Sequence, residues 1–292
     1  MSKEVLCRCS QVTVKGQQNV LLNDISLQIK KEQITALISE DDSAGEILKL
    51  IAGLYQPDKG QITYPGMKKE EVAAYPKRIQ YVPDDIICYP DLTVWDFIHG
   101  IANGSEQMEA TAEKLLSLFG INANEQLLEM TFGDNRLVSI IQAVMAQPAL
   151  LLLDRPYDML EREDYRRILK EIVNLYSRGS GIVIAAQSYK EVVIPCHEYI
   201  FLENGKIAGQ YNRDQLPLPA KVVTLWGGSI ASFMREKMEI LSRNKECFRF
   251  LYRESDMKEL GIRIGMSGCR NFNVEELTME EELFENYERW LQ

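Results

Sequence analysis

The sequence predicts an α/β protein in which helices cover both faces of a mostly parallel sheet, followed by a small α+β appendage. Three observations support this fold class. Short apolar runs typical of buried strands alternate along the chain with segments that have one apolar helical face. A proline-marked break, DQLPLPAKV, ends this alternation at 214–222. The 292 residues suffice for one large domain, or for a medium domain with a smaller one attached.

The first part of the chain combines strands, an acidic loop and a helix. A strand pattern covers 18–29, and the β-rich run QITALIS at 33–39 ends where the acidic loop begins. The helical segment GEILKLIAGL follows at 45–54, and QPDKG at 56–60 forms a turn. The apolar face of this helix consists of Ile47, Leu50, Ile51 and Leu54.

Capping and stop signals mark the later elements of this part. Thr93 can cap a short helix within YPDLTVWDFIHGI, and Gly120 ends an amphipathic helix at 105–119. Pro148 stops the helix that begins at residue 135, just before the buried strand ALLLLD. The other predicted elements are a strand at 78–85, a helix at 161–177 and strands at 181–187 and 199–203.

The last part of the chain differs in character and has a strongly acidic end. Its strand and helix patterns predict an α+β domain of about 70 residues. We therefore divide the chain into domains 1–215 and 216–292. The patterns of the second domain are strands at 221–226 and 246–252 and helices at 229–242 and 275–291.

Charge and composition exclude several classes of protein. The net charge of −10 disfavours nucleic acid as a partner. The longest apolar runs are far shorter than the roughly 20 residues that span a bilayer. The first residues, MSKEVLCRCSQV, lack a secretory signal, so the six cysteines are expected to stay reduced in the cytosol. Only Cys7 and Cys9 lie close in sequence and only two histidines are present, so no zinc site is predicted.

Four motifs, in this order, resemble the ATP-binding cassette domain of ABC transporters, a P-loop NTPase-like fold with a helical subdomain. The resemblance covers residues 1–215. It implies a transporter subunit that binds and hydrolyses ATP. The motifs are VLLNDISLQIKKEQITALI for the opening strands, LKLIAGLYQPDKGQI for the first helix and its turn, YVPDDIICYPDLTV for the Q-loop region and AQPALLLLDRP for the Walker B strand.

The phosphate loop departs from the family pattern. In the family it ends in Gly-Lys-Ser/Thr, because bare amides bind phosphate, lysine neutralises it and the hydroxyl holds magnesium. Here the loop contains Ser43 and its end reads Gly45-Glu46-Ile47, and the spacing into LKLIAGL is one residue short. A carboxylate beside a triphosphate reverses an interaction worth about 4 kcal/mol per unit-charge pair at about 4 Å. We expect residues 39–46 to form a solvated acidic loop.

The Q-loop, signature and adenine-stacking positions also depart. By resemblance, Asp84 replaces the Q-loop glutamine, which contacts the metal and the membrane partner, and Val14 replaces the aromatic residue that stacks on adenine. Phe132 adds bulk where backbone should meet phosphate, and Asp134 adds negative charge at a helix start. The signature Leu-Ser-Gly-Gly-Gln, which completes the partner's ATP site, aligns with Met130, Thr131, Phe132, Gly133 and Asp134.

Walker B keeps its aspartate, Asp154, which would hold magnesium if the metal binds. Arg155 replaces the catalytic glutamate, and an arginine that stays protonated cannot act as a general base. Gln187 replaces the switch histidine and cannot gain its positive charge. We therefore expect no functional catalytic residue. Arg155 could equally form an ion pair with the acidic loop.

The resemblance implies a subunit of an ABC transporter, of the exporter type because VEELTMEEELF is similar to the closing pattern of exporter cassettes. The departures predict an inactive scaffold or regulatory half, which binds ATP and magnesium weakly or not at all. Its partners would be a second, active cassette in a heterodimer and a transmembrane permease at the inner face of the cell membrane. Tyr89, Trp95 and Phe97 either anchor that permease or pack in the core.

Two other functions remain open. One is an active ABC ATPase with an atypical phosphate loop, in which Asp154 binds magnesium and Lys49 supplies a positive charge. The other is a soluble ABC-type interaction protein that never meets a membrane. Whether the chain is an enzyme therefore depends on whether it binds and hydrolyses ATP.

Overall fold

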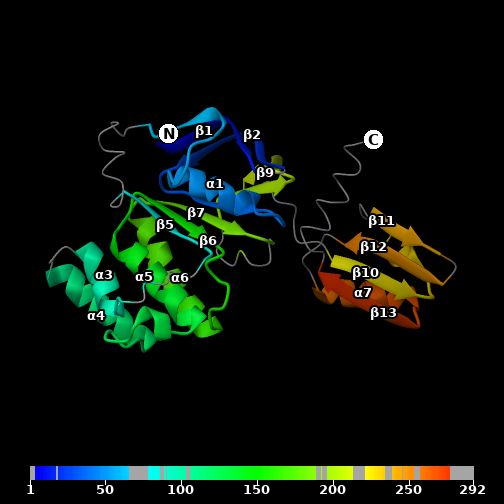
Figure 1. The fold of residues 1–292 in the computed structure, drawn as a ribbon. Coiled ribbons are helices and arrows are strands. Elements are labelled where there is room, and N and C mark those ends of the chain that lie inside the picture. The colour runs from blue at the N-terminus through cyan, green and yellow to red at the C-terminus, as the bar shows by residue number, and fades with distance from the viewer. Residues whose placement is uncertain are drawn as a thin grey trace. The chain divides into compact units, whose positions relative to one another are not determined.

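The computed structural model of the chain forms two compact units, Met1–Asp214 and Gln215–Gln292, which we call unit 1 and unit 2 (Figure 1). The residues that the structure describes are 4–17, 19–65, 78–85, 89, 91–102, 106–188, 192, 196–212, 221–233, 239–244, 246–252 and 257–276.

A six-stranded sheet with the order β5-β6-β7-β3-β8-β9 forms the centre of unit 1. Neighbouring strands are parallel except for β9, which pairs antiparallel with β8. The inner parallel strands are continuous buried apolar runs, as expected for a sheet covered on both faces. The strands are β3 (Ile34–Ile38), β5 (Ile79–Val82), β6 (Leu150–Asp154), β7 (Gly181–Ala186), β8 (Glu198–Glu203) and β9 (Lys206–Asn212).

Unit 1 also contains a second sheet, which is antiparallel and has the strand order β2-β1-β4. Helix α1 (Ser43–Ile51) packs between the two sheets, and its buried side chains join both to one core. Figure 1 shows α1 on one side of the parallel sheet. The strands are β1 (Val5–Lys15), β2 (Val20–Lys30) and β4 (Lys59–Thr63).

The other side of the parallel sheet carries helices α5 and α6, and α3 and α4 pack beside α5 (Figure 1). Thr93 caps α3 as predicted: its hydroxyl accepts a hydrogen bond from the Asp96 amide at 3.1 Å. Gly120, at φ +68°, ends α4. The helices are α3 (Val94–Ala102), α4 (Glu106–Phe119), α5 (Phe132–Met145) and α6 (Arg162–Ser177), and a 3₁₀ turn, η2, covers Leu127–Glu129.

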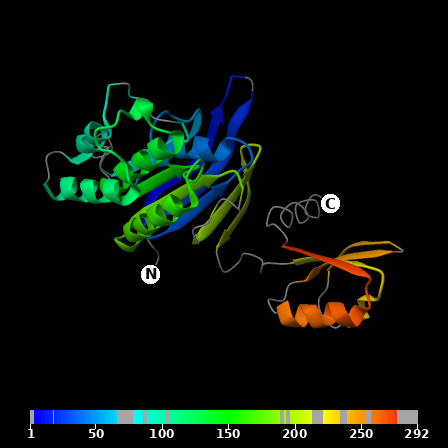
Figure 2. The same ribbon diagram turned by 90° about the horizontal axis from the view of Figure 1, so that it is seen from below.

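Unit 2 is a four-stranded antiparallel sheet with the order β11-β12-β10-β13. Helix α7 (Met257–Ser267) lies against one face of it (Figure 2). Phe233, from the 3₁₀ turn η5 (Ile230–Phe233), is the centre of their common core and lies 4.8 Å from the ring of Phe250. The strands are β10 (Lys221–Trp226), β11 (Glu239–Arg243), β12 (Cys247–Tyr252) and β13 (Asn271–Glu276).

The predicted fold class is confirmed, but several predicted elements are wrong or incomplete. The helix expected at 229–242 is instead η5 and then strand β11, because pairing with β12 outweighs the local helical pattern. Residues 275 and 276 belong to β13, and the rest of the helix expected at 275–291 lies outside the described residues. The elements that the sequence patterns did not predict are β1, β4, β9, α7 and β13.

The described part of the chain lacks two features, a membrane-spanning helix and a cluster of metal-ligating side chains. No helix in this part is both long and apolar enough to cross a membrane. Within the same part of the chain, no group of three or more histidine, cysteine or acidic side chains is arranged to hold a metal ion. Cys7 and Cys9, the two cysteines closest in sequence, are both buried in the core of unit 1.

The core of unit 2 depends on Phe233, and its loss should weaken that unit. Phe233 is 1% exposed, so Phe233→Ala should lower the free energy of unfolding of unit 2 by about 3–5 kcal/mol through lost burial and a cavity. The matched control is Phe272→Ala, since Phe272 is 54% exposed and its loss should change that energy by less than about 0.5 kcal/mol. Denaturant unfolding of the full chain tests both. Equal effects of the two variants would contradict the packing described here.

Candidate functional site

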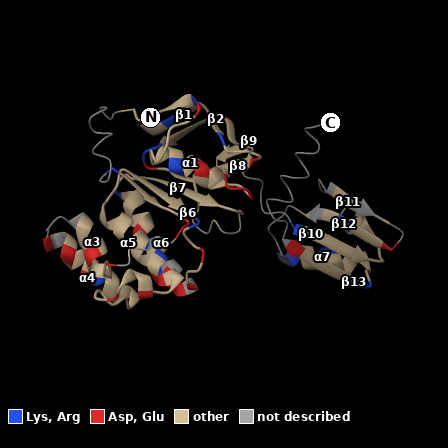
Figure 3. Ribbon diagram, viewed as in Figure 1, with Lys and Arg blue, Asp and Glu red and all other residues tan. Residues whose placement is uncertain are grey.

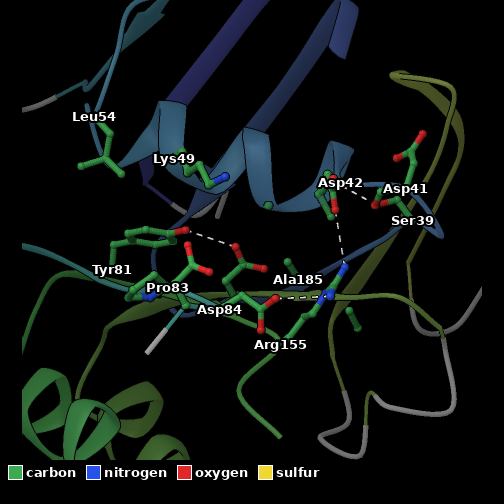
Figure 4. A pocket seen from close by; sticks show the side chains of 15 residues that line it. Ser39, Asp41, Asp42, Lys49, Leu54, Tyr81, Pro83, Asp84, Arg155 and Ala185 are labelled. Carbon is green, nitrogen blue, oxygen red and sulfur yellow. Dashed lines mark hydrogen bonds and ion pairs between the residues drawn. The ribbon is translucent and has the colours of Figure 1, made fainter. Parts of the chain in front are cut away.

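A cavity of about 310 Å³ lies in unit 1 where the parallel strands β5, β6 and β7 end (Figure 4). The acidic loop, residues 39–46, forms one wall of it together with α1. Residues 81–85 and the pair Asp154 and Arg155 form the opposite wall. Ligands of open parallel sheets bind at the carboxyl ends of the strands, so this cavity is the candidate functional site.

The first amides of α1 already have acceptors from the chain itself. The Ser43 amide donates a hydrogen bond to Asp41 Oδ1 at 2.9 Å, and the Ala44 amide donates to Ser39 Oγ at 3.0 Å. The Ser39 hydroxyl in turn donates to the Asp41 carbonyl at 2.7 Å. The amides at a helix start are the groups that bind phosphate in P-loop proteins. Here a carboxylate and a hydroxyl of the acidic loop occupy them.

Two residues expected in the phosphate loop, Glu46 and Ile47, are not among the residues that line the cavity. Ile47 is buried in the core of α1. The Glu46 carboxylate accepts a hydrogen bond from Tyr55 and pairs with Lys49 at 2.8 Å, so it is mostly buried rather than solvated. Glu46 raises the pKa of Lys49 through this contact. The expectation of a solvated acidic loop therefore holds for residues 40–42, which are exposed, and is wrong at Glu46. The exposed Asp41 carboxylate also accepts the hydrogen bond from the Ser43 amide.

Gly45 fills the place beside Asp154. A β-carbon on Gly45 would lie 2.8 Å from Asp154 Oδ2, so a side chain would collide with the carboxylate. Asp154 itself is buried and accepts a hydrogen bond from the Tyr81 hydroxyl at 3.1 Å. Burial is the main cause that raises the pKa of Asp154. Gly45 offers no hydroxyl to a metal ion beside Asp154, and a larger residue there would first have to displace the carboxylate, so these residues as they stand do not fit a magnesium triphosphate.

Arg155 connects the acidic loop to the segment after β5. Its guanidinium lies 3.6 Å from Asp42 Oδ1 and 3.2 Å from Asp84 Oδ2 (Figure 4). The expected ion pair between Arg155 and the acidic loop is thus present. Arg155 has a φ of +43°, an uncommon conformation for a residue with a long side chain. Arg155, which by resemblance stands at the position of the family glutamate, is thus a cation held between two acids.

A second arginine, Arg136 of α5, completes this network and was not predicted from the sequence. It is buried, and its guanidinium lies 3.1 Å from Asp84 Oδ1. It also donates to the carbonyl oxygens of Pro83 at 2.8 Å and Asp154 at 3.0 Å. The available signal was its charge within the otherwise apolar stretch RLVSIIQAVM. We call Asp42, Arg155, Asp84 and Arg136 the ion-pair chain.

The signature positions are explained by local folding. Thr131 caps α5, since its hydroxyl accepts from the Asp134 amide at 3.2 Å and donates to the Asp134 carboxylate at 2.6 Å. A β-carbon on Gly133 would lie 2.5 Å from the carbonyl oxygen of Met159. Phe132 is exposed, and Met130 is half-buried just before the cap. The hydroxyl and the glycine that remain of the signature therefore have roles within this chain.

The other predicted positions lie apart from the ion-pair chain. Gln187 is exposed after β7, and it is Ala185 and Ala186 of that strand that line the cavity. Val14 is buried in the core of β1. The three possible permease anchors differ in burial: Tyr89 is exposed, Trp95 is half-buried and Phe97 is buried. The ring centroids of Phe97 and Tyr89 lie 6.0 Å apart.

The sequence and the fold of unit 1 are both similar to those of known proteins. Residues 22–158 match the family model described as ABC transporter. A solved structure titled as the ATP binding subunit of an ABC transporter aligns with 72% of this chain and 91% of its own, with a TM-score of 0.66 and 20% identity. Unit 1 therefore has the fold of an ATP-binding cassette. Residues 22–158 are thus similar to the ABC transporter family, within a unit that has the cassette fold.

Curated relatives agree with this family. The chain is 28% identical over 174 residues to the molybdate/tungstate import ATP-binding protein WtpC of Pyrococcus abyssi, covering 54% of this chain and 48% of that protein. It is 31% identical over 209 residues to the Fe(3+) ions import ATP-binding protein FbpC 2 of Pectobacterium atrosepticum, covering 66% and 60%. The chain spans about half the length of the first curated relatives that it matches.

The raised pKa of Asp154 predicts a stability effect with a definite sign. The folded state favours the protonated form, so the ionised carboxylate costs stability once the pH exceeds the unfolded pKa of about 3.9. Asp154→Asn should therefore melt at a higher temperature than the wild type at pH 7, because it removes the buried charge and keeps an acceptor for Tyr81. This advantage should disappear at lower pH, where the wild type is protonated in both states.

Calorimetric melting of both proteins from acid to neutral pH measures this difference. The matched control is Asp96→Asn, which should have the opposite sign at pH 7, because hydrogen bonds from Thr93 lower the pKa of Asp96. A lower melting temperature for Asp154→Asn at neutral pH would refute the electrostatic cost assigned to Asp154.

Gly133, the glycine at the signature position, should contribute to the stability of the chain in the absence of any partner. Gly133→Ala should destabilise unit 1 by roughly 1–3 kcal/mol, because the new methyl group would press on the Met159 carbonyl. The control is Gly100→Ala in the interior of α3, where a β-carbon meets open space; it should stabilise the helix by up to about 1 kcal/mol. Thermal unfolding of the isolated chain measures both effects. An unchanged stability of Gly133→Ala would contradict the close approach of residue 133 to the Met159 carbonyl.

Proposed function

We propose that this chain is a catalytically inactive ATP-binding cassette subunit that serves as a scaffold or regulatory half of an ABC transporter. One observation carries the proposal: the first amides of α1, which would bind phosphate, donate instead to Asp41 and Ser39. An incoming phosphate would have to displace an internal carboxylate and then face the acids of the cavity. We therefore propose that ATP and magnesium bind weakly or not at all.

The replacement at the catalytic position supports the same proposal. Arg155 cannot accept a proton from an attacking water, and its charge is engaged by Asp42 and Asp84. A pair of such subunits would have no residue at this position to activate water. A second cassette with an intact phosphate loop and catalytic glutamate is therefore the partner that we propose, in a heterodimer bound to a transmembrane permease at the inner face of the membrane.

The direction of transport is a separate part of the proposal. The exporter type is based on the segment VEELTMEEELF, which lies mostly outside the described residues. The two curated relatives described above are named as import proteins. Identification of the permease that co-purifies with the chain decides between the two directions.

The alternative function, an active ABC ATPase, has one specific observation in its favour. Lys49 lines the same cavity as Asp154 and so places an ammonium group near the carboxylate. However, this ammonium group is paired with Glu46 at 2.8 Å. A nucleotide would have to compete with that carboxylate for the only positive charge contributed by α1.

Titration calorimetry of the purified full chain with Mg-ATP, together with a phosphate-release assay, tests the proposed function. We expect no binding at micromolar concentrations and no turnover, because the helix amides and Arg155 are already engaged. Micromolar binding with turnover that is lost in Asp154→Ala would instead establish the active-ATPase alternative.

The proposed partners are tested by purifying the chain from native membranes in mild detergent. A permease and a second cassette with intact Gly-Lys-Ser/Thr and Asp-Glu motifs should be recovered with it. Recovery of a homodimer with ATPase activity would contradict the scaffold role. Recovery in the soluble fraction without a permease would favour the soluble ABC-type interaction protein.

A further inference from the structure

We infer that the ion-pair chain is an internal latch that holds the acidic loop to the segment after β5 without a nucleotide. The inference rests on the proposed function, since a cassette that binds no nucleotide needs another connection between these segments. Charges alternate along it: Asp42 of the loop, Arg155 after β6, Asp84 after β5 and Arg136 of α5. Each neighbouring pair lies within ion-pair distance, at 3.6, 3.2 and 3.1 Å in that order.

Burial along the latch defines a fixed end and an exposed end. The side chain of Arg136 is 6% exposed and that of Arg155 is 22% exposed, whereas the side chain of Asp42 is 85% exposed. Buried charges are costly unless they are paired, and paired charges that are shielded from water are screened least by salt. Asp84 is therefore held firmly between two guanidinium groups. The ion pair between Asp42 and Arg155 is the more exposed contact and is the one that can break.

The backbone keeps Arg155 in place to make both contacts. Its amide donates to the Ala185 carbonyl at 3.1 Å, and its carbonyl accepts from the Asp158 amide at 3.2 Å. These bonds hold a positive φ, which a residue other than glycine adopts only where its surroundings impose it. A planar guanidinium can contact two carboxylates at once, which a single ammonium group does less well. Arginine is therefore suited to this position for geometric as well as electrostatic reasons.

The latch gives Asp84 a constant position. Arg136 also donates to the Pro83 carbonyl and to the Asp154 carbonyl, so the end of β6 and the segment after β5 are fixed to α5. By resemblance, Asp84 stands at the Q-loop position that faces the membrane partner. The latch would thus present this segment in one arrangement whether or not ATP is present elsewhere in the transporter.

Hydrogen exchange of the full chain, measured on peptides that cover 39–46 and 81–85, tests the latch. Arg155→Gln removes the central cation, so both peptides should exchange about tenfold faster than in the wild type. Asp42→Asn should accelerate only 39–46, because Asp84 keeps both arginines. The double variant should behave like Arg155→Gln alone. The matched control is Arg167→Gln, which removes an ion pair with Glu163 on α6 and should leave both peptides unchanged.

Unchanged exchange in a folded Arg155→Gln protein would overturn the latch, while the absence of ATP binding would leave the proposed function intact. Tight ATP binding by the wild type combined with faster exchange in Arg155→Gln would sink the proposed function but keep the latch. Should Arg155→Gln fail to fold, Asp42→Asn decides, because it changes an exposed side chain. In that case unchanged exchange of 39–46 in Asp42→Asn would overturn the latch.

Discussion

The first amides of a helix have no acceptor within the helix and need one from elsewhere. This constraint applies to α1, which begins at the carboxyl ends of the parallel strands. In the family the acceptor is phosphate. Here Asp41 and Ser39 take that role through bonds of 2.9 and 3.0 Å. Once the chain satisfies its own helix, α1 can form and pack between the two sheets without a ligand. These two amides at the start of α1 therefore need no ligand as an acceptor.

The departures from the family pattern support one another electrostatically. Asp42 and Asp84 would repel each other and Asp154 across the cavity if no cation were present, and Arg155 supplies one that contacts the first two. Without those acids, the largely buried guanidinium would itself be an unpaired charge. Glu46 similarly has Lys49 and Tyr55 as partners. These substitutions therefore form a compatible set, which argues against the view that each one is an independent loss.

Local signals in the sequence predicted the parts of the fold that depend on neighbouring residues. Apolar runs gave the buried parallel strands, Thr93 gave a cap, and the charges of Arg155 and the acidic loop gave an ion pair. The partly exposed strands β4 and β9 lack continuous apolar runs, and β11 depends on pairing with β12. The role of Arg136 could not be predicted, because its partners lie 18 or more residues away in sequence.

Residues that survive from the family motifs are informative only when their contacts are known. Thr131 and Gly133 match the signature, yet one caps α5 and the other makes room for the Met159 carbonyl. Asp154 matches Walker B, yet its carboxylate accepts from Tyr81 and lies against Gly45, while its carbonyl accepts from Arg136. Thr131 and Gly133 thus have structural roles in this chain, and Asp154 has contacts within the chain that involve no ligand. Their presence alone therefore does not distinguish a catalytic role from a structural one, and the proposed function rests instead on the α1 amides that donate to Asp41 and Ser39.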